Sequence, residues 1–312
     1  MSSAVWSAGV GVSFPSMNAA LIGLVTLLQT APSSAPRTTS LVDDVRLLAG
    51  ASTNEARFDA LTTMLRGYGL TFAVEPFTIE KPIGREPRTE GRNVVVTLGE
   101  GSPDLIIGAH YDAARLPDGS LSRGAVDNAA SSVILVRLAE ALRKEPPPVR
   151  IRIVWFDMEE LGLIGSGQYV KQHAADRVSA MLNLDVNAFG NTIVFGPSER
   201  PENAALRRTF VQTCAAEDIP CVPFPQMPPG DDRSFVKAGV PTISMGIVPA
   251  VDAHQLWLMM NAGPNSGLAQ GLVPSALRMI HTPEDSVEKL SDETMSRIER
   301  FALALVRAVA RR

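Results

Sequence analysis

The segment IRIVWFDMEE, from Ile151 to Glu160, decides the fold class of this chain. Five of its first six residues are apolar, and a short apolar run rich in β-branched and aromatic residues is typical of a buried strand. The predicted strand ends at Phe156 and runs directly into the carboxylates Asp157, Glu159 and Glu160. Ligands bind at the carboxyl ends of strands in open α/β sheets. The segment therefore predicts an α/β fold with a site at that edge.

Helices and strands alternate on both sides of this segment. Strands are predicted at 70–77, 93–98, 104–107, 180–184 and within 239–246, with a polar loop at 81–92. Helices are predicted at 41–48 and 56–68, after Asn128 as far as the prolines at 146–148, from 165, and at 204–216 and 292–311. This alternation predicts a three-layer α/β/α fold with a mixed, mostly parallel central sheet.

Composition excludes several classes of protein. The chain has 312 residues, 45% of them hydrophobic and 20% charged, which suits one large domain; we place it at residues 37–312. The net charge is -4 and aromatic residues make up 5%, so the chain has neither the basic surface nor the stacking residues of a nucleic-acid binder.

Residues 1–36 are predicted to lie outside this domain. From Met17 to Leu28 the chain is apolar and uncharged, which is too short to span a bilayer but suits a signal peptide. Small residues follow at 33–35, as at a cleavage site, although no basic residue precedes the apolar run. We expect an exported protein, periplasmic or secreted, with no membrane span in the mature chain. The alternative is a disordered extension.

The two cysteines, Cys214 and Cys221, allow two interpretations. They are either free thiols in or near the core or a local disulfide, which requires an oxidising compartment. Two cysteines without a CxxC motif give no support to a zinc site held by thiolates.

Side chains suited to metal binding follow three predicted strands. His110 and Asp112 follow one strand, Glu159 and Glu160 a second, and Asp185 a third. Because the carboxyl ends of parallel strands share one edge, we expect these side chains to lie close together.

Each candidate also has an ordinary explanation. His110 could be a capped histidine, Asp127 a helix cap, and the glutamate pair a solvated surface. However, Asp112 is placed to hold one ring nitrogen of His110, which leaves the other free for a metal. A cation would also relieve the repulsion between Glu159 and Glu160, so that one binds metal while the other faces the attacking water.

Several catalytic motifs are absent from the sequence. It contains neither HExxH nor GxSxG, which removes support for helix-borne zinc proteases and serine hydrolases. It also lacks GxGxxG and Walker signatures.

Five ordered motifs carry a resemblance to a known family. They are GAHYDA (108–113), GAVDNAAS (124–131), FDMEELGLIGS (156–166), LNLDV (182–186) and HTPEDS (281–286). From about Leu41 to its C-terminus the chain resembles the di-zinc aminopeptidases of the bacterial leucyl aminopeptidase and aminopeptidase Y type, which are related to glutaminyl cyclases. The resemblance implies the zinc-peptidase fold, a peptide substrate and two Zn²⁺ ions per chain.

The resemblance also implies a role for each matching residue. Asp127 would bridge the two ions. His110 and Glu160 would complete the ligands of one ion, and Asp185 and His281 those of the other. Glu159 would be the general base in removal of N-terminal residues from peptides, with Asp112 as the partner of His110.

The sequence departs from the family pattern on the substrate side. Asp232 stands where the family often has histidine, three residues before Phe235; both are candidate substrate contacts. The long segment 248–279 is expected to shape or cover the substrate pocket. Two alternatives remain: a cyclase acting on N-terminal glutamine, and a non-catalytic binding module, which would typically have lost ligand residues.

Overall fold

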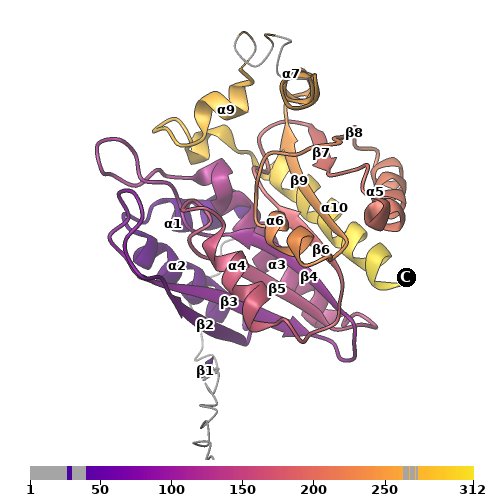
Figure 1. Ribbon diagram of the computed structural model, residues 1–312, viewed down its shortest axis with the longest axis horizontal. Helices are drawn as coiled ribbons and strands as arrows, with labels where there is room; N and C mark the ends of the chain where they lie inside the picture. The colour runs from indigo at the N-terminus through magenta and orange to yellow at the C-terminus, as the bar shows by residue number, and fades with distance from the viewer. Residues whose placement is uncertain (1–26, 30–39, 263–266, 268–270, 272) are drawn as a thin grey trace, which may run out of the picture.

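The computed structural model describes residues 27–29, 40–262, 267, 271 and 273–312 (Figure 1). The predicted leader at 1–36 therefore lies outside the described residues, apart from Leu27–Gln29, which form a short strand, β1. Within the described part, no helix is both long enough and apolar enough to cross a bilayer.

The core of the fold is one mixed sheet. Its other strands are β2 (Phe72–Thr78), β3 (Glu90–Leu98), β4 (Asp104–His110), β5 (Ile151–Phe156), β6 (Val178–Leu184), β7 (Thr192–Gly196), β8 (Cys221–Pro223) and β9 (Thr242–Val248). The spatial order is β1-β2-β3-β5-β4-β6-β9-β7-β8. The central strands β5, β4, β6 and β9 run parallel, whereas β3 and β7 flank them antiparallel. The predicted α/β fold with a mixed sheet is confirmed.

Helices cover both faces of the sheet. They are α1 (Leu41–Ala49), α2 (Asn54–Gly67), α3 (Ala130–Lys144), α4 (Ile164–Gln172), α5 (Ala204–Ala216), α6 (Asp232–Lys237), α7 (Ala250–Asn261), α9 (Ser275–Met279) and α10 (Asp292–Ala310). Helices α1, α3, α5 and α10 pack on one face, and α4 and α6 on the other (Figure 1). Helices α7 and α9 lie beyond one end of the sheet (Figure 1).

The sequence sets where three of these helices begin. The side chains of Ser40, Thr53 and Ser291 accept hydrogen bonds from backbone N–H groups in the first turns of α1, α2 and α10. Each such cap satisfies a backbone N–H that the helix itself leaves without a partner, and it stabilises the folded state by about 1 kcal/mol.

Two apolar layers hold the helices to the sheet. The larger layer joins α1, α2, α3 and α10 to one face and includes Leu61 and Trp155, both fully buried. The smaller layer, under α4 and α6, contains Phe156, Tyr169 and Phe235. Burying a large apolar side chain stabilises the folded state by roughly 1.5–3 kcal/mol. Both layers therefore hold the strands, and with them the strand ends, in fixed positions.

Some elements differ from their predictions. Strand β3 begins at Glu90, inside the predicted loop 81–92, and β9 runs to Val248 because its end pairs with β7. The short strands β7 and β8 and the helix α7 were not predicted. Helix α7 reads AVDAHQLWLMMN, which is apolar on several sides and lacks clear helical periodicity.

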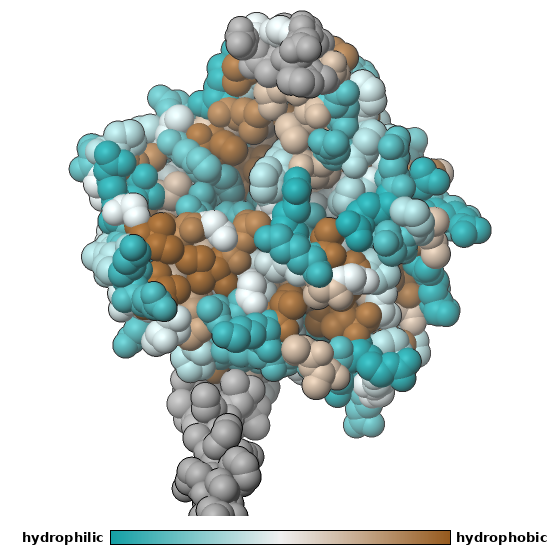
Figure 2. Space-filling model, viewed as in Figure 1, coloured by the Kyte–Doolittle hydropathy of each residue, from teal (hydrophilic) through white to brown (hydrophobic). Residues whose placement is uncertain are grey.

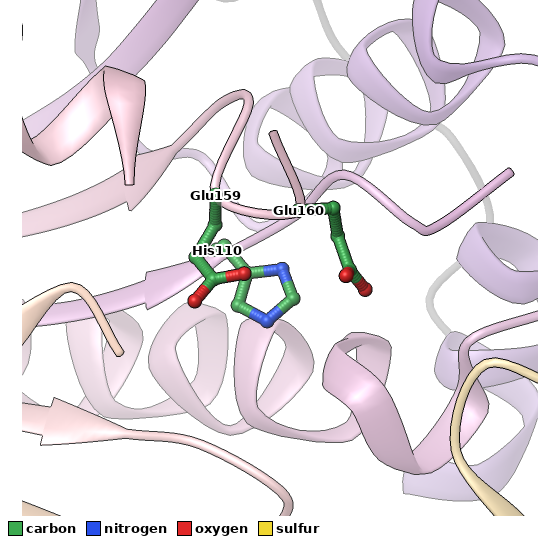
Figure 3. A group of neighbouring side chains, drawn as sticks. All are labelled: His110, Glu159 and Glu160. Carbon is green, nitrogen blue, oxygen red and sulfur yellow. The ribbon is translucent and has the colours of Figure 1, made fainter. Parts of the chain in front are cut away.

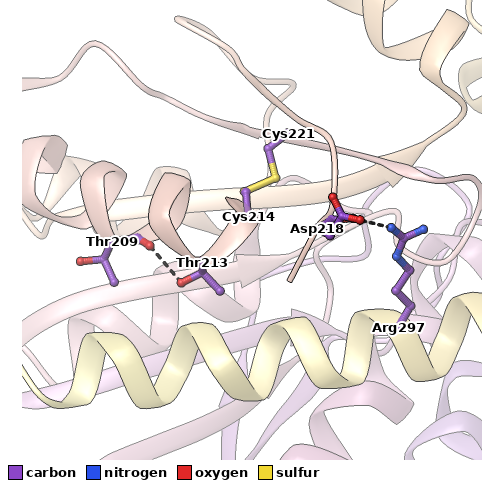
Figure 4. Close-up of a disulfide and its surroundings, with 6 residues drawn as sticks. All are labelled: Thr209, Thr213, Cys214, Asp218, Cys221 and Arg297. Carbon is purple, nitrogen blue, oxygen red and sulfur yellow. Dashed lines mark hydrogen bonds between the residues drawn. A yellow bond between two sulfur atoms is a disulfide. The ribbon is translucent and has the colours of Figure 1, made fainter. Parts of the chain in front are cut away.

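The two cysteines form a disulfide. Cys214, near the end of α5, is bonded to Cys221, the first residue of β8 (Figure 4). Of the two interpretations of the cysteine pair, the local disulfide is the one found.

Candidate metal centre

Five segments meet at the carboxyl edge of the sheet. His110 ends β4, Asp185 follows β6, and Glu160 lies in the turn after β5. Asp127 lies in the turn Ala125–Ala129 that leads into α3, and His281 follows α9. The structure thus brings together all five residues expected to bind metal.

The ligand atoms form two groups that share Asp127. Its Oδ1 lies 3.1 Å from His110 Nε2, which lies 3.6 Å from Asp185 Oδ1. Its Oδ2 lies 3.2 Å from His281 Nε2, which lies 2.9 Å from Glu160 Oε2. Each group offers three nitrogen or oxygen atoms close enough to hold one ion.

The resemblance implied that His110 and Glu160 hold one ion and Asp185 and His281 the other, and His110, Glu159 and Glu160 do form a third group of neighbouring ligand atoms. The contacts that meet at Asp127 instead join His110 to Asp185 and His281 to Glu160. The reason is the orientation of Asp127, because each of its oxygens faces a different pair of elements.

The donor set fits two divalent cations. Imidazole nitrogens and carboxylate oxygens are ligands that zinc accepts, and a shared carboxylate is typical of sites with two metals. Glu160 Oε1 is buried and has no hydrogen-bond partner among the described residues. A buried carboxylate oxygen without a partner is costly, and a cation would relieve that cost.

The carboxylates of the site favour the binding of a cation. Hydrogen bonds to Asp127 and Glu160 raise the pKa of His281 to about 11. Burial, followed by the charge of Asp127, raises the pKa of Glu160 to about 7. Burial acts to raise the pKa of Asp127, but hydrogen bonds from His110 and His281 outweigh it and hold that pKa below its usual range.

Glu159 lies outside the two groups that share Asp127, and its carboxylate forms a third group of neighbouring ligand atoms with His110 and Glu160. Figure 3 shows Glu159 and Glu160 leaving one turn, with their carboxylates on either side of the His110 ring. Burial raises the pKa of Glu159 well above its usual value, and the side chain lines the adjoining cavity. A carboxylate with a raised pKa that faces a cavity is suited to accept and return a proton.

Asp112 supports both the histidine and the glutamates. Its Oδ1 lies 3.5 Å from His110 Nδ1, on the ring side away from Asp127. Its carboxylate also accepts hydrogen bonds from the backbone N–H groups of Glu159 (3.1 Å) and Glu160 (3.3 Å). Asp112 therefore orients the ring, as the sequence suggested, and also holds the turn that carries both glutamates.

Asp285 supports the backbone beside Asp127, a role that no feature of the sequence indicated. Its carboxylate accepts hydrogen bonds from the backbone N–H groups of Val126 (2.7 Å) and Asp127 (3.1 Å). It lies in the HTPEDS motif, four residues after His281, so one short segment supplies a candidate ligand and fixes the backbone of another.

A cavity of about 200 Å³ adjoins the metal centre. Besides the polar side chains of the centre and Ser244, the cavity is lined mainly by apolar side chains, among them Val186, Val194, Met227, Val248, Leu256, Ala276, Leu277 and Ile280. Four of these lie in segment 248–279, which therefore forms part of the wall of the cavity beside the candidate metal centre. Figure 2 shows hydrophobic side chains gathered around α9 on this face of the molecule.

The two candidate substrate contacts are not in this cavity. Phe235 is a core residue that packs against Phe156 and Tyr169, contrary to the expectation. Asp232 is buried and lines a neighbouring cavity with Arg200 and Arg233. The position of a residue relative to a motif does not show which side of its helix the residue lies on. In α6, Phe235 lies on the side that packs against the sheet.

Comparison with known proteins assigns the family. The sequence profile of peptidase family M28 matches residues 93–306, well over half of the chain. The chain belongs to peptidase family M28. It is 34% identical over 137 residues to an aminopeptidase from Pseudomonas aeruginosa, a stretch that covers 39% of this chain and 25% of that relative. The chain thus spans about a quarter of the length of this relative.

Solved structures share the fold. A zinc aminopeptidase from Bacillus subtilis superposes with a TM-score of 0.52 at 20% identity, covering 70% of this chain and 50% of that one. A glutaminyl cyclase from Porphyromonas gingivalis superposes with a TM-score of 0.65 at 18% identity, covering 86% and 96%. The family and the paired ligand groups together make this edge of the sheet the candidate active site.

Proposed function

We propose that the protein is a zinc-dependent aminopeptidase that removes N-terminal residues with apolar side chains. The observation that carries the proposal is the position of Asp127 between two ligand groups, with Glu159 beside them and an apolar cavity adjoining. The family and the P. aeruginosa aminopeptidase support the same reaction.

The residues of the chain have distinct tasks in this reaction. Two bound zinc ions would polarise the scissile carbonyl and lower the pKa of the attacking water. Glu159 accepts a proton as the water oxygen bonds to the carbonyl carbon. It then returns that proton to the leaving amine as the carbon–nitrogen bond breaks. Asp112 keeps Glu159 in place by accepting a hydrogen bond from its N–H, and its backbone carbonyl lies 3.2 Å from His110 Nδ1.

The cavity would receive the side chain of the first residue of the substrate. Its apolar lining offers no charged partner away from the metal centre, so leucine-like side chains fit it better than lysine or glutamate. The disulfide between Cys214 and Cys221 supports the proposal that the protein is exported, because such bonds persist in oxidising compartments.

A panel of aminoacyl-nitroanilides, assayed alongside metal quantification, tests the proposal. We expect close to two zinc ions per chain and release of apolar residues. Formation of pyroglutamyl peptide and ammonia from glutaminyl peptides would instead identify a cyclase. Bound zinc with neither activity would indicate a binding module.

The role of Glu159 is tested by Glu159→Ala. We expect the variant to retain its zinc and to lose hydrolysis by at least a hundredfold, the usual scale for a general base. Glu90→Gln, on an exposed glutamate in β3, is the matched control and should keep full activity. Retained activity in Glu159→Ala would contradict the assignment.

A further inference from the structure

Arg57 is a fully buried arginine in α2, behind the metal centre. Its guanidinium donates three hydrogen bonds, all to backbone carbonyls: Nε to Tyr111 (2.6 Å), Nη1 to Arg123 (2.8 Å) and Nη2 to Gly124 (3.3 Å). The planar fork of one side chain thus joins two loops that are separate in sequence.

Both loops carry candidate metal ligands. Tyr111 stands between His110 and Asp112, and Gly124 precedes the turn that contains Asp127. The second loop is tightly packed, since a Cβ added at Gly124 would lie 2.4 Å from the carbonyl oxygen of Asp127. A shift of either loop would therefore move a ligand.

A second residue of α2 holds the first loop. Asn54 accepts a hydrogen bond from the N–H of Ala113 (2.9 Å) and donates one to the carbonyl of Ala113 (3.2 Å). Arg57 and Asn54 together fix the residues on both sides of Asp112, which in turn orients His110 and the Glu159–Glu160 turn.

The charge of Arg57 also belongs to the site. A buried guanidinium is costly unless negative charge lies nearby. The carboxylates whose charges stabilise it are those of the centre and its supports: Asp112, Asp285, Glu160 and Asp127. The same cation that anchors the loops therefore offsets part of the negative charge of the ligand carboxylates.

We propose that Arg57, assisted by Asn54, is a positioning residue that sets the spacing of His110 and Asp127 for metal binding. The effect of Arg57 on catalysis rests on the proposed function. Its effect on loop structure and zinc affinity can be tested without it. Helix α2 precedes the region matched by the family profile, and through Arg57 and Asn54 it would support the active site.

The test compares Arg57→Lys, Arg57→Met and Asn54→Ala with the intact chain. In metal-free protein we expect hydrogen exchange to accelerate in the loops 111–113 and 122–128 while α10 stays protected. Zinc affinity should fall at least tenfold in Arg57→Lys, which keeps the charge but loses the fork, and further in Arg57→Met. If Arg57→Met does not fold, the other two variants carry the comparison.

Leu61→Ala is the matched control, because it weakens the apolar packing of the same helix and removes no hydrogen bond to either loop. It should lower Tm yet leave zinc affinity within threefold. Wild-type exchange and affinity in Arg57→Lys, or an equal loss of affinity in Leu61→Ala, would overturn the proposal. A wild-type chain that exchanges as expected but hydrolyses no peptide would count against the proposed function alone.

Discussion

Asp127 places one carboxylate oxygen in each ligand group, so a change at this residue should reach both metals. We expect Asp127→Asn to keep the fold, because Asp285 bonds to the backbone at this position rather than to the side chain. Metal content should fall from about two ions per chain to below one, measured by plasma mass spectrometry after dialysis. Asp118→Asn, on an exposed loop, is the control, and two retained ions in Asp127→Asn would refute the bridge.

The size of the N-terminal side chain accepted should depend on Ala276. This residue is buried in α9 and lines the cavity, so Ala276→Leu would fill space that the proposed function assigns to the first side chain of the substrate. Each misplaced methylene costs about 1–3 kcal/mol in such pockets. We expect kcat/KM for leucyl-nitroanilide to fall at least tenfold while that for alanyl-nitroanilide changes little. An equal loss for both substrates would show that Ala276 does not select for size.

For single residues, the sequence predicted which side chains come together at the candidate metal centre, but not which of them share an ion. His110 and Asp185 follow from strand ends, because neighbouring parallel strands end at one edge. Which ligands face the same oxygen of Asp127 depends on the orientation of its carboxylate, which spacing does not encode. Arg57 and Asp285 were missed because their partners are backbone atoms distant in sequence, and such contacts leave no pattern in residue type.

Among the elements, the disulfide joins the end of α5 to the edge strand β8, which leads into the pocket. Phe224 follows β8 and is buried, and Met227 lines the cavity. Closing so short a loop stabilises a fold by about 2–3 kcal/mol in the chain-entropy model. We expect the double variant Cys214→Ser, Cys221→Ser to lose stability on that scale in urea and to show a raised KM. Unchanged unfolding would mean that the bond contributes little.

Helix α4 is tied to β2 by a histidine between two carboxylates. His173 Nε2 lies 3.1 Å from Glu75, and its Nδ1 lies 2.9 Å from both Asp176 and the Arg152 guanidinium. Burial and the charge of Arg152 act to lower the pKa of His173, but the contacts with Glu75 and Asp176 outweigh them, and the pKa is raised. The contact of protonated His173 with the carboxylates therefore stabilises the folded state fully below the pKa of histidine in the unfolded chain, near 6.5. This stabilisation is lost as pH rises through the pKa of His173 in the folded state.

His173→Gln should expose this dependence. The difference in unfolding free energy between the intact chain and the variant should be about 1–3 kcal/mol at pH 5.5 and should shrink towards pH 9. Urea unfolding across that range measures it, and taking the difference cancels groups common to both proteins. A difference that stays constant or grows with pH would rule out a protonated His173.

For the whole molecule, strand alternation predicted the fold class, but the order of strands came from contacts between distant segments. The two segments at opposite ends of the described domain, for example, meet where Asp292 of α10 accepts hydrogen bonds from Ser40 (2.9 Å) and the N–H of Val42 (3.0 Å) at the start of α1. Strand β7 pairs with β9, and the three-residue strand β8 pairs with β7 and is joined to α5 by the disulfide. Local sequence patterns cannot specify such pairings.

The five candidate ligands lie between residues 110 and 281 and come from separate segments of one fold, so zinc binding should stabilise the molecule as a whole. Unfolding would disperse the ligands, and a ligand that binds only the folded state stabilises it by about 2.7 kcal/mol per site at a hundred times its Kd. We expect Tm to rise with zinc in thermal unfolding and to fall on chelation, with a much smaller response in Asp127→Asn. A Tm that zinc and chelator leave unchanged in the intact chain would show that the two ligand groups do not bind the ion.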